Sequence, residues 1–112
     1  MNLAVLYAAL AIAVPPPTTI SGGTAQQVNE ALLADIEAVE AVRHVVYHTA
    51  LPFRDYLAIN GRSSWPEAEK AIHDDYRSRL AYLNEEHRRR KHRQHAFAKQ
   101  AHLPIYRPAR HY

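Results

Sequence analysis

Two long stretches of the chain place apolar residues three or four positions apart, which is the period of an amphipathic helix. Both stretches predict helices, and the first is long enough to allow a short coiled-coil seam. The first runs from about Ala25 to His48, and its stripe comprises Val28, Leu32, Ile36, Val39, Val42 and Val46. The second runs from Ser64 to Leu103, and its stripe comprises Trp65, Ala68, Ile72, Tyr76, Leu80 and Leu83.

Helix starts are indicated by two capping boxes, in which a hydroxyl residue is followed three positions later by Glu or Gln. Thr24 and Gln27 form the first pair, and Ser64 and Glu67 form the second. Pro66 suits the first turn of the second helix, because the N–H that it lacks would have no partner there.

Proline and glycine predict where the first helix ends. Leu51-Pro52 predicts a break near Thr49, since proline cannot donate an interior hydrogen bond and disfavours helix in the residue before it. Residues 53–59 then predict a short helical corner, and Asn60-Gly61 predicts a left-handed stop. The two long helices on either side are expected to pack antiparallel.

The pattern as a whole predicts an all-α fold. It consists of two long antiparallel helices with a short helical corner, an apolar N-terminal segment and an extended basic C-terminal tail. We divide the chain into residues 1–23 (apolar segment and Pro/Gly linker), 24–103 (helical hairpin) and 104–112 (tail, with two prolines).

The uncharged run from Asn2 to Val14 allows three interpretations. It is too short to span a bilayer unaided, which takes about 20 residues. Ala11-Ile12-Ala13 matches a signal-peptide cleavage pattern, although no basic residue precedes the run. The run could also anchor the chain at a membrane surface, or form a helix buried against the rest of the chain or a neighbouring subunit. Pro15–Pro17 ends whatever structure precedes it.

Charge is distributed unevenly along the 112 residues, although the formal net charge is only +3. From His87 onward the chain has eight Lys or Arg residues, five His and no acid. Such asymmetry suggests an anionic partner for this end. The candidate anion-binding residues are Arg88, Arg89, Arg90, Lys91, Arg93, Lys99, Arg107 and Arg110.

The anionic partner of this basic run could be an acidic protein surface, nucleic acid or anionic lipid. A solvated cationic run with no partner is the simplest alternative. Consecutive charges cover every face of a helix, and no helix-turn-helix spacing or zinc pattern accompanies them. The chain has no cysteine, which excludes disulfides and thiolate metal sites.

Two further groups of residues contain side chains that occur in metal sites or catalytic sites. Glu40, His44 and His48 share a helical face, and Glu69 and His73 could approach them, but the Glu-x-x-His signature of dinuclear bundles is absent. His73-Asp74-Asp75 has no nucleophile or glycine-rich loop nearby. We therefore predict no metal site, no cofactor and no catalytic activity.

The sequence predicts a non-catalytic structural or interaction subunit of a larger assembly, whose partners are other protein subunits. It would dock by apolar helix faces and by the basic end, which could also contact nucleic acid. The candidate docking residues are Leu3, Leu6, Tyr7, Leu10 and Trp65. The alternatives are a membrane-associated protein anchored by the N-terminal run, and a nucleic-acid-binding helical module. Cellular location is not predicted beyond membership of a complex.

Overall fold

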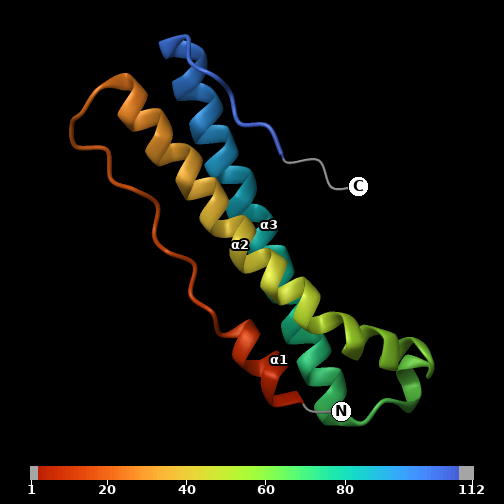
Figure 1. The fold of residues 1–112 in the computed structure, drawn as a ribbon. Coiled ribbons are helices and arrows are strands. Elements are labelled where there is room, and N and C mark those ends of the chain that lie inside the picture. Colours follow the sequence, from red (N-terminus) through yellow and green to blue (C-terminus); the bar gives the residue numbers. More distant parts are fainter. Residues whose placement is uncertain (1–2, 109–112) are drawn as a thin grey trace.

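The computed structural model describes residues 3–108. Its elements in order are α1 (Leu3–Leu10), α2 (Ala25–Ala58), the short 3-10 turn η1 (Arg62–Ser64) and α3 (Glu67–Ala101). The long helices α2 and α3 lie side by side in a molecule of 55 × 29 × 18 Å (Figure 1). Asn29 near the start of α2 contacts Gln94 near the end of α3, whereas Arg43 contacts Asn84. The predicted all-α antiparallel hairpin is therefore confirmed.

An apolar core fills the half of the hairpin nearest the α2–α3 connection. The α2 stripe contributes Val39, Val42 and Val46, which continue into Ala50, Phe53 and Leu57. The α3 stripe contributes Ile72, Tyr76 and Leu83, and Leu6 of α1 completes the cluster. Burial of these side chains is the main source of stability, at about 1.5–3 kcal/mol for each large one.

The other half of the hairpin has a mixed interior. Leu32, Ile36 and Ala98 are buried there together with polar residues. Each buried polar group must find a partner, because an unpaired one costs about 1–3 kcal/mol. The buried polar residues are Asn29, Asp35, His87, Arg90 and Gln94.

The start of α2 is the capping box that the sequence predicts. The Thr24 hydroxyl accepts from the Gln27 amide at 3.1 Å, and the Gln27 side chain accepts from the Thr24 amide at 3.0 Å. These two bonds satisfy donors that the first helical turn leaves free.

The predicted break at Leu51-Pro52 is wrong, because α2 continues through Pro52 to Ala58. Phe53 and Leu57 extend the apolar stripe by the same three- and four-residue steps, and both are buried. Their burial outweighs the loss of one hydrogen bond at Pro52, which is exposed. The helix changes direction in this region (Figure 1), as expected for an internal proline.

The predicted start of α3 at Ser64 is also wrong. Ser64 lies in η1, where its hydroxyl donates to the Gly61 carbonyl at 2.7 Å instead of capping a helix. Pro66 keeps Trp65 extended, and α3 begins at Glu67 without a side-chain cap.

The left-handed stop falls at a different place from the one predicted. Gly61 has φ −63°, and Asn60 is not left-handed. Instead, His102 after α3 has φ 56°, and the Leu103 amide bonds back to the Ala98 carbonyl at 2.9 Å. This geometry ends α3 just before Pro104.

Helix α1 packs against both long helices and buries Leu6 and Ala9. This placement agrees with the interpretation of the N-terminal run as a buried helix. Residues 11–24 follow without regular secondary structure and lead back to the start of α2 (Figure 1); we call them the strap. Among residues 3–108, no helix combines the length and apolar character needed to cross a membrane.

Candidate functional site

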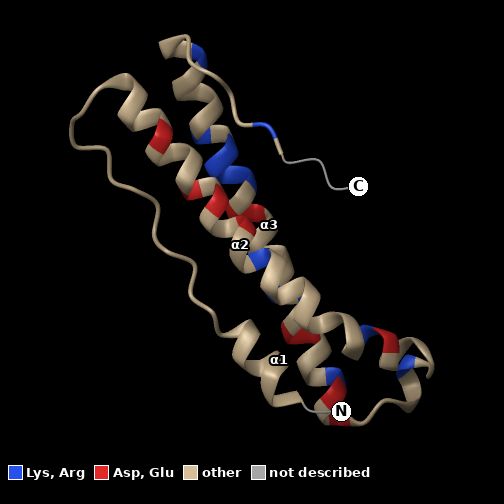
Figure 2. Ribbon diagram, viewed as in Figure 1, with Lys and Arg blue, Asp and Glu red and all other residues tan. Residues whose placement is uncertain are grey.

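The basic run lies on the C-terminal half of α3, opposite the acid-bearing part of α2 (Figure 2). Arg88 and Arg89 point outward, with side chains 64% and 68% exposed. Both pair with Glu85, at 2.6 and 3.3 Å, and these contacts lower the pKa of Glu85. Exposed pairs of this kind contribute little to stability.

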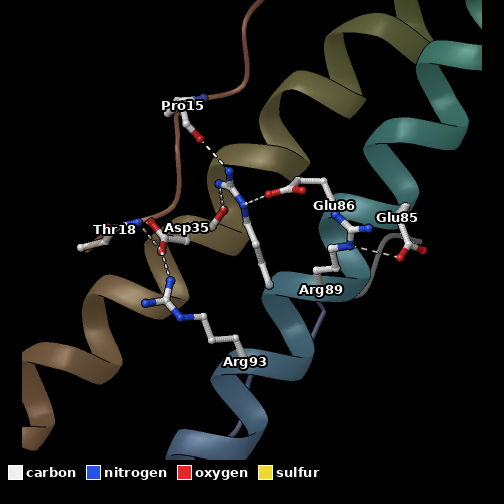
Figure 3. A network of polar contacts seen from close by, with 8 residues as sticks. Pro15, Thr18, Asp35, Glu85, Glu86, Arg89 and Arg93 are labelled. Carbon is white, nitrogen blue, oxygen red and sulfur yellow. Dashed lines mark hydrogen bonds and ion pairs between the residues drawn. The ribbon is translucent and has the colours of Figure 1, made fainter. Parts of the chain in front are cut away.

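Arg90 points in the opposite direction and is buried, with 5% exposure. Its guanidinium donates to the Pro15 carbonyl of the strap at 2.6 Å, to the Asp35 carbonyl of α2 at 2.9 Å and to the Glu86 carboxylate at 2.9 Å. Three segments of the chain thus meet on one side chain, in the network of Figure 3. The Arg90 guanidinium donates its hydrogen bonds within the protein, so we exclude Arg90 from the candidate anion-binding surface.

Asp35 holds the strap at a second point. Its carboxylate accepts from the Thr18 amide at 2.9 Å and from the Thr18 hydroxyl at 2.7 Å (Figure 3). Arg93 approaches the same carboxylate at 3.9 Å, while its side chain stays 40% exposed. Arg93 therefore keeps donors available on the outer surface.

The tail is attached to the hairpin by a buried amide, Gln94. The Gln94 side chain donates to Asn29 and to the Pro104 carbonyl, both at 3.0 Å, and accepts from the Tyr106 amide at 2.9 Å. These bonds satisfy a side chain with 0% exposure. Residues 104–108 have no regular secondary structure, as predicted, and the tail contacts α2 and α3 through Pro104 and Tyr106.

Tyr106 carries the tail to Glu40 of α2. Its hydroxyl hydrogen-bonds the Glu40 carboxylate, and burial followed by this bond raises the pKa of Tyr106 to about 12. The buried His87 ring packs edge-on against Tyr106, at 6.0 Å between centroids. Burial and the Arg43 charge lower the pKa of His87, although Glu40, 3.4 Å from its Nε2, opposes them. His87 is therefore neutral at pH 7.

The remaining predicted cations differ in accessibility. Lys99 and Arg107 are exposed, and Lys91 is half-buried. Arg110 lies outside the described residues. The outward-facing cations of the basic run are thus Arg88, Arg89, Arg93, Lys99 and Arg107; we call them the basic face.

Most of the predicted docking residues pack against other parts of the protein. Leu6 is buried in the core, and Leu3, Leu10 and Trp65 pack against it while partly exposed. The Trp65 indole also donates to the Asn60 carbonyl at 2.9 Å. Tyr7 is 48% exposed and lines a groove of about 410 Å³ together with Tyr82 and Arg79 of α3.

The carboxylate and imidazole side chains that were candidate metal ligands do not come together at one site. Glu40 faces His87 and Tyr106, His44 and His48 stack on each other at 4.1 Å, and His73 contacts Trp65. Within residues 3–108 no three His, Asp or Glu side chains are grouped as metal ligands.

A second cationic region was missed by the sequence reasoning. Two cavities, of about 390 and 330 Å³, lie between α2 and α3 and share Tyr47 and Leu80. We call them together the arginine groove. Arg43 and Arg54 belong to α2 and Arg77 belongs to α3, so the packing of the two helices brings Arg77 beside the α2 arginines. The lining residues are Arg43, His44, Tyr47, His48, Arg54, His73, Tyr76, Arg77, Leu80 and Asn84.

Comparisons of the chain with protein-family models, with curated proteins and with solved structures found no match.

Proposed function

We propose that this protein is a non-catalytic interaction subunit that docks on an acidic partner surface through its basic face. The observation that carries the proposal is the direction of the cations on α3. Arg90 is buried within the fold, whereas Arg88, Arg89 and Lys99 point outward on a stretch that has no acid after Glu86.

Electrostatic considerations support an extended contact over a compact pocket. The basic face comprises exposed cations on several turns of α3 together with Arg107 in the tail. Charges arranged along a rod suit a partner with an elongated acidic surface, and they accelerate association more than they strengthen it. Tyr7 of α1 and Tyr82 of α3 are exposed, line one groove and offer aromatic anchors.

Sedimentation from the native source at moderate salt tests this proposal. We expect the protein to migrate within a larger particle and to leave it when salt is raised, because exposed charges are screened. The triple variant Arg88→Glu, Arg89→Glu, Lys99→Glu should migrate as the free chain. Migration of the unmodified protein as a free species of its own mass, 12.8 kDa, would reject the proposal.

Two parallel assays separate the alternative partners. Co-flotation with anionic vesicles that is lost on charge reversal would instead assign the basic face to lipid. Binding to nucleic acid that weakens steeply with salt would assign it to nucleic acid. Either result, in the absence of a protein particle, would replace the docking function proposed here.

A further inference from the structure

The arginine groove has cationic side chains in its lining and no carboxylate, although His73 contacts Asp74 outside the lining at 3.5 Å. Its lining includes three arginines and three histidines but no Asp or Glu. Among residues 3–108, Arg43, Arg54 and Arg77 form no ion pair with any carboxylate. Arg54 and Arg77 line the smaller cavity, and Arg43 lines the larger one. Two cations beside the same cavity repel each other, and an anion in that cavity relieves the repulsion.

The pairing of other arginines makes these three distinctive. Arg62 pairs with Asp74, and Arg90 pairs with Glu86. Arg43 instead reaches only the neutral amide of Asn84, at 3.4 Å. Arg54 and Arg77 are exposed on facing helices. Neither side chain pairs with a carboxylate among residues 3–108, and the planar guanidinium fits two phosphate oxygens at once.

The groove also provides aromatic surface beside the charge. The Tyr47 ring is 41% exposed and is shared by both cavities. The Arg54 guanidinium lies over that ring, 5.5 Å from its centroid, so a cation and an aromatic ring occur together. A planar ring bound here could stack on Tyr47 while its charged group contacts the arginines.

A buried hydroxyl points to the same place. Tyr76 lines the smaller cavity, is 4% exposed, and its hydroxyl has no hydrogen-bond partner within the described part of the chain. Burial raises the pKa of Tyr76, and the charge of Arg54 partly opposes this. A buried hydroxyl without a partner is costly for a structural tyrosine, and a ligand oxygen would remove that cost.

We propose that the arginine groove binds a nucleoside polyphosphate. The phosphates lie against Arg54 and Arg77, within reach of the Tyr76 hydroxyl, and the base stacks on Tyr47 in the larger cavity near Arg43. Cavities of about 390 and 330 Å³ fall within the size range of small-molecule sites, which begins at about 300 Å³. The groove does not include the basic face, so this site is independent of the docking function proposed above.

The single tryptophan provides an internal reporter for the test. Trp65 lies 5.0 Å from the ring of His73, which lines the groove. Titration of the full chain with ADP, by calorimetry, and with pyrophosphate, by calorimetry and Trp65 fluorescence, should give saturable binding. We expect ADP to bind more tightly than pyrophosphate, because its base adds stacking on Tyr47.

Charge-matched variants identify the site. Arg54→Gln with Arg77→Gln removes two positive charges inside the groove, and Arg88→Gln with Arg89→Gln removes two outside it. We expect the first pair to weaken ADP binding at least about tenfold, as for loss of charge-assisted hydrogen bonds, and the second to leave it within about twofold. Tyr76→Phe should weaken ADP binding without lowering the melting temperature, since its hydroxyl has no hydrogen-bond partner to lose within residues 3–108.

Three results would overturn this proposal. The first is equal weakening by the two double variants, which would show attraction by general charge. The second is no saturable binding of either probe at millimolar concentration. The third is a single-stranded oligonucleotide that displaces ADP and binds far more tightly, which would make the groove part of a nucleic-acid surface. Particle association is measured separately, so failure here leaves the docking function standing.

Discussion

Replacing Arg90 by methionine tests the network that joins the strap, α2 and α3. Methionine keeps an unbranched apolar stem but has no donor. The change leaves three acceptors without their partner: the Pro15 carbonyl, the Asp35 carbonyl and the Glu86 carboxylate. We expect the strap to detach near Pro15 while the two-helix hairpin persists, since the apolar core lies elsewhere.

The expected size of the effect follows from these contacts. A hydrogen bond from a charged donor contributes about 1.5–3 kcal/mol, and breaking a buried ion pair costs about 3–5 kcal/mol. Glu86 keeps 15% exposure, so water recovers part of this loss. We expect a total of about 4 kcal/mol, a large share of the roughly 5–15 kcal/mol that small domains possess. The melting temperature should fall by about 15 °C.

Denaturant unfolding followed by circular dichroism measures the change in the free energy of unfolding. Arg89→Met is the matched control, because it removes the adjacent cation, which is 68% exposed and pairs only with Glu85 among the described residues. This control should cost less than about 1 kcal/mol. Arg90→Lys should fall between the two, since one ammonium cannot span the three acceptors.

Equal losses in the Arg90 and Arg89 methionine variants would refute the reasoning. They would show that the Arg90 contacts contribute no more than an exposed ion pair. Loss of all helical signal in Arg90→Met would refute the expectation that the two-helix hairpin persists when the strap detaches.

Three further predictions concern single residues. Thr24→Ala should destabilise the protein by about 1 kcal/mol in denaturant unfolding, through loss of the α2 cap; no change would mean that the cap frays. Pro52→Ala should stabilise it by about 1–2 kcal/mol, because an exposed helix interior regains its donor; destabilisation would show that the bend is required for packing. The lowered pKa of His87 means that the unfolded chain binds more protons, so stability is full above about pH 6.5 and falls as pH drops below it. His87→Gln should flatten this dependence in melts across the range, and an unchanged slope would assign it to other groups.

The helical parts of the fold could be predicted because they depend on local pattern. The Thr24 box and the stripe from Val28 to Val46 involve neighbours within four residues, so the sequence displays them directly. The predictions at Pro52 and Ser64 are wrong because other interactions outweigh the local preference of proline to end a helix and of serine to begin one. Burial of Phe53 and Leu57 favours the continuation of α2 beyond Pro52. Pro66 keeps the preceding residue extended, so α3 begins after Ser64.

The candidate site could be predicted only in part. A run of basic residues shows net charge, but not which side chain points inward; Arg90 differs from Arg89 only by one step of helical rotation. The arginine groove was missed because Arg77 lies on a different helix from Arg43 and Arg54. Their convergence depends on the register of α2 against α3, and no local signal specifies that register.

The strap has a consequence for the order of events during synthesis. Its carbonyl at Pro15 is held by a residue 75 positions later, whereas Thr18 reaches Asp35 only 17 positions on. Because the ribosome releases the N-terminus first, α1 emerges long before α3, and Leu6 and Ala9 have no complete surface to pack against. Before α3 is made, α1 can contact α2 alone, so its apolar side chains stay incompletely buried and open to chaperones and to aggregation during that interval.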